Sequence, residues 1–409
     1  MATLHRAVES ENAIISISKH EPTMTDYDFS YLPDRSGTGS IKWDRYRDSS
    51  ILPMWVADMD FRSPPEVEAA LNGRVAHGVF GYTNPTQEVI SAVCRYMGDA
   101  HNVEISEEWL LWTPGLVPAL NTAARALCNT GEAVLTTVPI YPPFLSAPRY
   151  QNRELLVASL SNESGRYTYD WDALESAVTS STRVFFMCNP HNPVGRVWSL
   201  QELERIVAFC QEHHLILVSD EIHCDLILSD KLQHHTAMKL GSWVVDNSIT
   251  LMSPSKTYNL CGLACSFVII PNTQLRRSFH RSMRGLFNEI NCLGYAACAA
   301  AYQSGAAWRS ELISVLRTNW HEISAFCDNR MPLIKLTPLE ATYLAWLDIR
   351  QLELSNPRTH FESHGVGLSD GVEFGTPGFL RMNFGCPTAR VLEALTQMEK
   401  AYINSDGVL

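Results

Sequence analysis

The stretch that decides the fold is Ile249–Met252 (ITLM) together with the turn that follows it, Ser253–Leu263 (SPSKTYNLCGL). The first part has the composition of a buried β-strand, and the second is rich in small and hydroxyl residues and carries one lysine, Lys256. Desolvation and nearby cations at such a position favour the neutral, nucleophilic form of an amine, which can form a Schiff base with an aldehyde. Taken alone, the segment fits a surface lysine in a loop equally well.

Further apolar runs lie on both sides of this strand, and helical patterns separate them between residues 65 and 300. The runs are Ala133–Val138, Arg183–Cys188, Leu215–Val218 and Ser266–Ile270. Strands that are apolar on both sides and separated by helices are typical of a parallel or mixed sheet with helices on both faces. The sequence therefore predicts an α/β fold.

One of the intervening helices has a clear start signal. Ser199 and Glu202 form a capping-box pattern, in which the hydroxyl and the carboxylate bind end amides reciprocally. Apolar residues then recur at helical spacing, which predicts one buried face, at Leu203, Ile206, Val207 and Cys210.

The chain of 409 residues is too long for one ordinary core and suggests two domains. Its last quarter has a different pattern and ends in a periodic helix through Val391, Leu395 and Met398. We predict a loose leader over residues 1–25 and a large domain over 61–300 that contains the sheet. A smaller α+β domain would combine residues 26–60 with 301–409.

The composition narrows the class of protein. A formal charge of −12 argues against a nucleic-acid-binding surface, which would need clustered lysine and arginine. The 11 cysteines include no C-x-x-C pair, and Cys261 and Cys265 lack zinc spacing, so we expect reduced thiols and no metal site. No run approaches the ~18 apolar residues of a membrane span, and residues 1–23 lack the apolar core of a secretion signal. We expect a soluble, cytoplasmic protein.

Polar side chains follow three of the predicted strands. Asn189 comes after Arg183–Cys188, Asp220 after the next strand, and Lys256 after Ile249–Met252. Ligands of such sheets bind beyond the carboxyl ends of the strands. An amide, a carboxylate and an amine would therefore face one crevice.

These three groups match the needs of pyridoxal 5′-phosphate. A carboxylate such as that of Asp220 keeps the pyridine nitrogen protonated, and the Asn189 amide can donate to the ring phenolate oxygen, which His223 can share. Each residue also has an ordinary structural interpretation: a helix N-cap or metal ligand for Asp220, a turn for Asn189, and a buried structural imidazole for His223.

The phosphate group needs backbone amides at a helix N-terminus. Thr113–Leu120 contains a glycine turn that runs into a helix, and Pro118 has no N–H, so we expect the amides of Leu116 and Val117 to donate. The hydroxyls of Ser253 and Ser255 can add to this set. A glycine turn before a helix is a weak signal alone, because many helices begin this way.

Two more residues complete the predicted site. Tyr141, in a proline-rich turn after a strand, can stack on the coenzyme ring, although a core aromatic would look the same. Arg381 lies in an apolar stretch, and a buried guanidinium normally has an anionic partner. Its planar fork suits a substrate carboxylate, and the alternative is an internal salt bridge.

Four longer motifs carry a family resemblance: Pro53–Phe61 (PMWVADMDF), His77–Thr83 (HGVFGYT), Ser219–Asp225 (SDEIHCD) and Ala341–Asp348 (ATYLAWLD). Across nearly its whole length the chain resembles the fold-type I, class I and II aminotransferase family of pyridoxal-phosphate-dependent enzymes. More narrowly, it resembles the MalY/PatB-type branch of cystathionine β-lyases and other C–S lyases. The resemblance implies a large domain with a mostly parallel sheet of the seven-stranded type and a smaller α+β domain.

The resemblance also implies roles for the predicted residues. Lys256 would form the internal aldimine and remove the α-proton, and Asp220 would pair with the pyridinium. Asn189 and His223 would face the phenolate oxygen, with Asn189 also near the substrate, and Tyr141 would stack on the ring. Aminotransferases of this family usually carry tyrosine at the position of His223.

Three residues would bind the substrate or join two subunits. Arg381 would hold the substrate carboxylate, and Trp55 would line the substrate entrance. Tyr82 would reach the phosphate of a neighbouring subunit, because this family forms homodimers with shared sites. The chain departs from the family at Ala264, where a second basic phosphate ligand is common, and at Tyr258 and Cys261.

The expected reaction is β-elimination from a cysteine thioether, such as cystathionine or a cysteine S-conjugate, to give a thiol, pyruvate and ammonia. The alternatives are an aminotransferase or synthase-like relative, and a lyase of a natural-product pathway that acts on a large cysteine- or glutathione-derived conjugate. Regulatory binding of a partner protein, or a non-catalytic relative, belongs to a different class. The intact Lys256, Asp220 and Arg381 argue against the non-catalytic relative.

Overall fold

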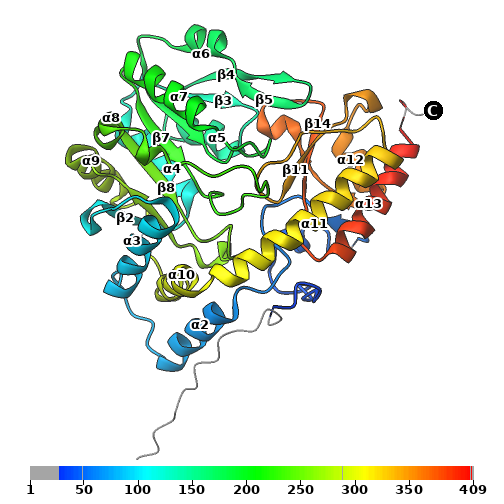
Figure 1. Ribbon diagram of the computed structural model, residues 1–409, viewed down its shortest axis with the longest axis horizontal. Coiled ribbons are helices and arrows are strands. Elements are labelled where there is room, and N and C mark those ends of the chain that lie inside the picture. The colour runs from blue at the N-terminus through cyan, green and yellow to red at the C-terminus, as the bar shows by residue number, and fades with distance from the viewer. Residues whose placement is uncertain (1–26, 48, 288, 406, 408–409) are drawn as a thin grey trace, which may run out of the picture.

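The computed structural model describes residues 27–47, 49–287, 289–405 and 407, so the predicted leader over 1–25 lies outside the described residues. Two sheets organise the chain, a large one near the middle of the sequence and a small one formed by its last quarter (Figure 1). The α/β fold expected from the sequence is confirmed.

The large sheet has eight strands in the order β2-β9-β8-β7-β6-β3-β4-β5. The five strands β8, β7, β6, β3 and β4 are mutually parallel, whereas β9 and the outer strand β5 pair antiparallel to their neighbours. The bounds are β2 Leu110–Thr113, β3 Ala133–Val138, β4 Glu154–Glu163, β5 Arg166–Tyr169, β6 Thr182–Cys188, β7 Ile216–Asp220, β8 Ser248–Met252 and β9 Ser266–Ile269.

Helices cover both faces of this sheet because successive side chains of a strand point to opposite sides. In β6, Val184 and Phe186 pack with residues of α4, α5 and α9, whereas Phe185 and Met187 pack with residues of α6, α7 and α8. Helices α4, α5 and α9 span Leu116–Leu127, Pro142–Tyr150 and Thr273–Met283. Helices α6, α7 and α8 span Trp171–Ala177, Leu200–Glu212 and Ser242–Asn247. The predicted capping box of α7 is present, with Ser199 and Glu202 each binding the other's backbone amide.

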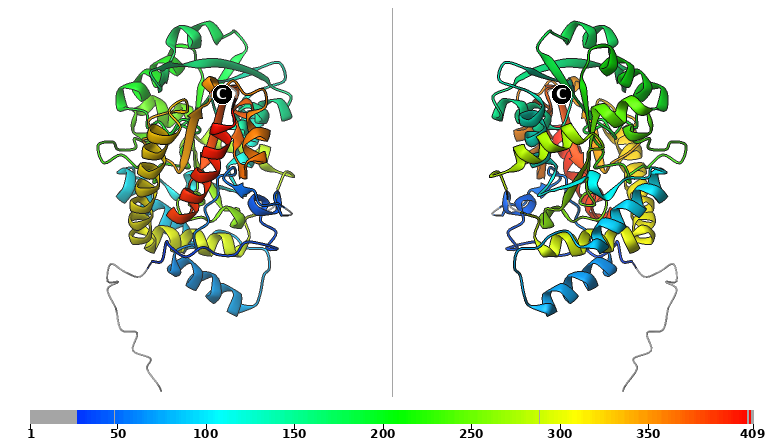
Figure 2. Two further views of the ribbon diagram at one scale, coloured as in Figure 1. Left: turned by 90° about the vertical axis from the view of Figure 1, so that its right-hand side faces the viewer. Right: turned by 90° about the vertical axis from the view of Figure 1, so that its left-hand side faces the viewer.

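The small sheet has the order β10-β11-β14-β13, and all of its pairs are antiparallel. Helices α11 and α13 pack on its strands in one apolar core, and Figure 2 shows them over this sheet. Strands β10, β11, β14 and β13 span Lys335–Leu336, Leu344–Asp348, Phe379–Asn383 and Ser369–Asp370, respectively. Helices α11, α12 and α13 span Ala306–Arg330, Pro357–Ser363 and Thr388–Ile403.

The segment that precedes the large sheet is tied to the end of the chain. Strand β1, Leu52–Pro53, pairs in parallel with β12, Val366–Gly367. The remaining helices are α1 Ile41–Asp44, α2 Pro65–His77, α3 Gln87–His101 and α10 Cys292–Ser304. This pairing agrees with our grouping of residues 26–60 with 301–409, although the domain bounds remain a prediction.

Three strands of the large sheet were not expected from the sequence. Strands β4 and β5 form an outer antiparallel hairpin, and most of β4 is exposed or half-buried, although it contains the apolar run Leu155–Ala158. Strand β2 is only four residues long. None of the helices within the described ranges is long and apolar enough to cross a membrane.

Candidate active site

A cavity of about 240 Å³ lies at the carboxyl ends of the parallel strands. Strand ends supply Asp220 from β7 and Lys256 from the turn after β8, and the N-terminus of α4 closes the opposite side. The predicted residues that line this cavity are Leu116, Val117, Tyr141, Asp220, His223, Ser255 and Lys256. The strand order places β7 beside β8, which explains why residues 36 positions apart meet there.

The Lys256 amine is held by the chain itself. Its Nζ donates to the Ala57 carbonyl oxygen over 2.6 Å and lies 3.5 Å from the Cys261 Sγ. Burial lowers the pKa of the amine, but Cys261, Tyr343 and Tyr141 raise it more, so the pKa of Lys256 lies above its usual value. The direction of this pKa shift is opposite to the neutral amine expected from the sequence, because groups that favour the ammonium form surround the amine.

Asp220 is buried at the end of β7, with 3% of its surface exposed. Burial raises the pKa of its carboxyl to about 7, against the hydrogen bond from the Ile222 amide and the charge of Lys256, which lower it, and with the help of Glu221. A buried carboxylate with a single amide partner is well placed to receive a cation such as a pyridinium.

The structure corrects the prediction that Asn189 faces the coenzyme. Its side-chain amide donates to the His235 carbonyl oxygen over 3.0 Å, its Oδ1 accepts from the Trp198 amide, and the residue does not line the cavity. Asn192, three positions later, lines it instead. Both residues belong to one turn. The side chain of Asn189 holds this turn in place by binding the neighbouring backbone groups, and it is therefore not free to bind a ligand.

His223 lines the cavity with 2% of its surface exposed, and its Nδ1 has no hydrogen-bond partner among the described residues. Burial, Lys256 and Arg381 lower the pKa of the imidazole to about 3, so the ring is neutral. A buried, unsatisfied ring nitrogen is costly unless a ligand satisfies it. This nitrogen is therefore available to a bound group.

The α4 end of the cavity carries the predicted amides. Gly115 is the N-cap with φ +113°, and Leu116 and Val117 are the first helical residues, whose N–H groups have no partner within a helix. Ser255 lines the cavity beside them. Ser253 does not; its Oγ lies 2.9 Å from the Ser255 Oγ and 2.8 Å from the Cys265 carbonyl oxygen, so it supports Ser255 from behind.

Arg381, on β14 of the small sheet, is 4% exposed and forms no ion pair with any described residue. Its guanidinium donates to the Asn192 Oδ1 and the Trp55 carbonyl oxygen, each over 3.0 Å, and its Nε has no partner among the described residues. Burial lowers its pKa to about 10. The internal salt bridge that we considered is absent there, which leaves the charge available to an anionic ligand.

Trp55 and Tyr82 do not line the cavity. The Trp55 ring packs under the guanidinium of Arg45 and donates to the Lys42 carbonyl oxygen, so only the Trp55 backbone reaches Arg381. The role of Trp55 at the substrate entrance therefore stays a prediction. Tyr82 is 99% exposed, between α2 and α3.

Sequence reasoning missed three contributors to the site. These are Asn192, the carbonyl of Ala57, and Tyr343, whose hydroxyl also donates to that carbonyl. Asn192 had a usable signal, since NPHNPVG contains two asparagines and either one fits the spacing. Backbone carbonyls leave no mark in the sequence.

The donor set fits pyridoxal 5′-phosphate. An amine, a buried carboxylate, an unsatisfied imidazole nitrogen and free helix amides surround one cavity, and they match the aldehyde, pyridine nitrogen, phenolate and phosphate of that coenzyme.

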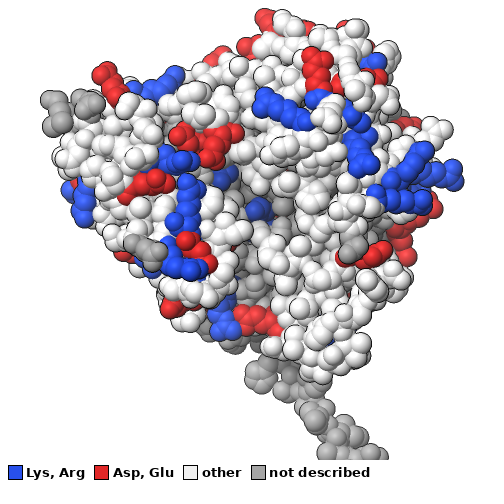
Figure 3. Space-filling model, turned by 180° about the vertical axis from the view of Figure 1, so that it is seen from behind, with Lys and Arg blue, Asp and Glu red and all other residues white. Residues whose placement is uncertain are grey.

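Seen from the side opposite to Figure 1, the surface is hollowed near its centre, and basic and acidic side chains are interspersed over this face (Figure 3).

Comparisons with known proteins identify the family of the chain. The sequence profile described as aminotransferase class I and II matches residues 52–398. Cystathionine beta-lyase PatB of Bacillus subtilis (strain 168) is 36% identical over 91% of this chain and 99% of its own length. The crystal structure of OvoB has a TM-score of 0.90 and 37% identity, over 93% of this chain and all of that one.

A third similar protein was solved with pyridoxal phosphate bound. The pyridoxal-phosphate-bound C–S lyase from Staphylococcus hominis has a TM-score of 0.87 and 29% identity, over 93% of this chain and 99% of its own. The chain therefore belongs to the aminotransferase class I and II family, with the α/β fold of its pyridoxal-phosphate-dependent enzymes. The resemblance to the MalY/PatB-type branch is confirmed by the likeness to PatB.

Proposed function

We propose that the protein is a pyridoxal-phosphate-dependent C–S β-lyase that cleaves a cysteine thioether to a thiol, pyruvate and ammonia. The observation that carries the proposal is the single cavity in which the Lys256 amine, the Asp220 carboxylate and the free amides of α4 meet. The likeness to PatB over nearly the full length supports the lyase reaction over transamination.

The chain's own residues divide the work. When bound, the coenzyme supplies the electron sink that stabilises negative charge at the substrate Cα. Lys256 takes the proton from Cα, and Arg381 fixes the substrate carboxylate so that the Cα–H bond is aligned with this base. A thiolate leaves from Cβ, and one water is consumed as the remaining three-carbon unit is released as pyruvate and ammonia.

The remaining cavity residues orient the coenzyme. Asp220 pairs with the pyridine nitrogen, Tyr141 stacks on the ring, and Leu116, Val117 and Ser255 bind the phosphate. Asn192, in the place first assigned to Asn189, and His223 face the phenolate oxygen. Both line the cavity, and the unsatisfied Nδ1 of His223 supports this role.

The protein is proposed to act as a cytoplasmic homodimer with shared sites. Tyr82 is exposed and does not line its own chain's cavity, and Val79 and Phe80 beside it are also exposed apolar residues. Burial of such a loop against a second copy would bring Tyr82 to the partner's phosphate.

The test is incubation with L-cystathionine and a panel of cysteine thioethers of graded size, followed by assays of thiol and pyruvate. We expect both products in equal amounts from at least one compound, and none from the Lys256→Ala variant. Absence of keto acid with every compound would refute the lyase assignment.

Two alternatives are resolved by the same preparation. An aminotransferase would convert its coenzyme to a stable pyridoxamine form with an amino acid alone, and we expect no such accumulation. A preference for the largest conjugates in the panel would point to a natural-product pathway instead of cystathionine cleavage.

A further inference from the structure

The segment Trp55–Phe61, here called the 55–61 segment, touches both side chains that the proposed reaction uses. The carbonyl oxygen of Ala57 accepts from the Lys256 Nζ over 2.6 Å. The carbonyl oxygen of Trp55 accepts from an Arg381 Nη over 3.0 Å. Lys256 follows a strand of the large sheet and Arg381 lies in the small sheet, so this short segment links the two.

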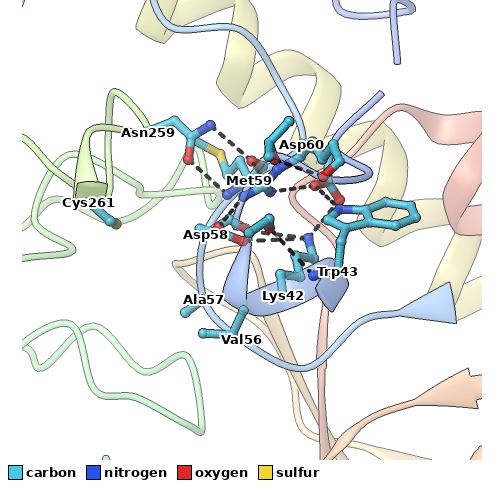
Figure 4. A network of polar contacts seen from close by, with 12 residues as sticks. Lys42, Trp43, Val56, Ala57, Asp58, Met59, Asp60, Asn259 and Cys261 are labelled. Atoms are coloured by element: carbon cyan, nitrogen blue, oxygen red, sulfur yellow. Dashed lines mark hydrogen bonds and ion pairs between the residues drawn. The ribbon is translucent and has the colours of Figure 1, made fainter. Parts of the chain in front are cut away.

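Two asparagine side chains fasten this segment, and each lies close in sequence to one of those side chains. Asn259, three residues after Lys256, donates to the carbonyl oxygens of Met59 and Phe61 over 2.9 and 2.8 Å and accepts from the Met59 amide over 2.9 Å. Figure 4 shows Asn259 reaching across to Met59.

Asn383, two residues after Arg381, binds the segment from the other side. Its side-chain amide donates to the carbonyl oxygens of Val56 and Asp58, the latter over 2.6 Å. Asn383 is fully buried, so its donors have no access to water as an alternative partner.

A buried ion cluster anchors the same segment. Lys42 Nζ lies 2.7 Å from an Asp60 carboxylate oxygen, with 0% and 1% of the two side chains exposed. Arg35 pairs with Asp58 and Asp60 over 2.7 Å each, and the Trp43 indole donates to Asp60 over 2.9 Å (Figure 4). Charges so deeply buried are stable only with good geometry, which specifies one position for the segment.

We propose that the 55–61 segment positions Lys256 relative to Arg381, and that Asn259, Asn383 and the Lys42–Asp60 pair are positioning residues that hold it. The segment presents carbonyl oxygens to the amine and to the guanidinium, while the amide and ionic contacts keep its backbone from shifting. The inference rests on the proposed roles of Lys256 and Arg381.

Two variants should loosen the 55–61 segment without changing Lys256 or Arg381. Asn259→Gly removes the amide contacts and tolerates the left-handed backbone at this position, φ +57°. Lys42→Met removes the buried cation and leaves Asp60 paired with Arg35. The matched control is Arg62→Met, which breaks an exposed salt bridge to Glu68 one residue beyond the segment.

The measurement is a titration of each coenzyme-loaded protein with L-alanine, followed by the visible absorbance of the coenzyme. We expect the apparent Kd to rise about 10- to 100-fold in Asn259→Gly and Lys42→Met, because small displacements of the amine and guanidinium spoil a two-point grip. Arg62→Met should stay within about twofold of the wild type, since its salt bridge is exposed.

A purely structural role predicts a different pattern. Lower Tm with an unchanged L-alanine Kd in both variants would overturn the proposal. If neither variant folds, Arg35→Met decides, because it removes a partly exposed guanidinium that holds the segment through Asp58, Asp60 and the Met59 carbonyl oxygen, and an unchanged Kd there would also refute it. L-alanine binding requires no C–S cleavage, so this result stands apart from the outcome of the thioether assay.

Discussion

The carboxyl of Asp220 links the site to pH. Its pKa of about 7, against 3.8 for an exposed aspartate, means that the folded chain holds the proton more tightly than the unfolded chain. Stability of the coenzyme-free protein should therefore be highest below pH 4 on account of this group, and should fall as the pH rises from about 4 to 7.

Replacement of that carboxyl by a neutral amide tests the sign. We expect coenzyme-free Asp220→Asn to be more stable than the wild type at pH 8, by up to about 4 kcal/mol, since it has no buried charge to form. At pH 4 the two should converge. Urea unfolding at both pH values measures this, and a variant that is less stable than the wild type at pH 8 would contradict the assignment.

The two asparagines of the NPHNPVG turn should separate binding from stability. Asn192→Ala removes the side-chain oxygen that accepts from Arg381, so the KM for the thioether should rise about tenfold through a less oriented guanidinium. Asn189→Ala leaves the His235 carbonyl without its donor and should cost about 1–3 kcal/mol of stability. Steady-state kinetics and thermal unfolding of both variants check this. A KM of Asn192→Ala equal to that of the wild type would contradict the role of Asn192 in orienting Arg381.

Helix α4 provides the phosphate amides in our proposal, and its first position allows one amide to be deleted cleanly. Leu116 is that position, where proline is well tolerated; the substitution removes an N–H that has no helical partner together with a buried leucine side chain, which Leu116→Ala also removes. Leu116→Pro should weaken coenzyme binding about 10- to 100-fold, whereas Leu116→Ala retains the amide and should bind more tightly than the proline variant. Coenzyme titration followed by absorbance compares the two, with circular dichroism as the check that α4 remains intact.

Strands that are apolar throughout were predictable, and elements with mixed exposure were not. Strand β3 occupies the predicted range Ala133–Val138 and is buried on both faces, whereas β4 is largely exposed or half-buried and ends in the polar residues Ser161–Glu163. Similarly, Asp220 and Lys256 follow such strands and could be placed at the site from the sequence alone. The choice between Asn189 and Asn192 depends on how the turn folds back on Asp220, which local pattern does not specify.

The relation between the two copies of the proposed dimer is testable through Tyr82, because its side chain lies outside its own chain's cavity. Lys256→Ala and Tyr82→Ala should each be nearly inactive alone. If Tyr82 serves the partner's site, a mixed dimer contains one site with both residues intact, and an equal mixture should regain about one quarter of wild-type activity. The two proteins are unfolded together, refolded and assayed for pyruvate, with separately refolded samples as controls. If Tyr82 acts within its own chain, every site in the mixture lacks one of the two residues, and activity should stay at the level of the single variants.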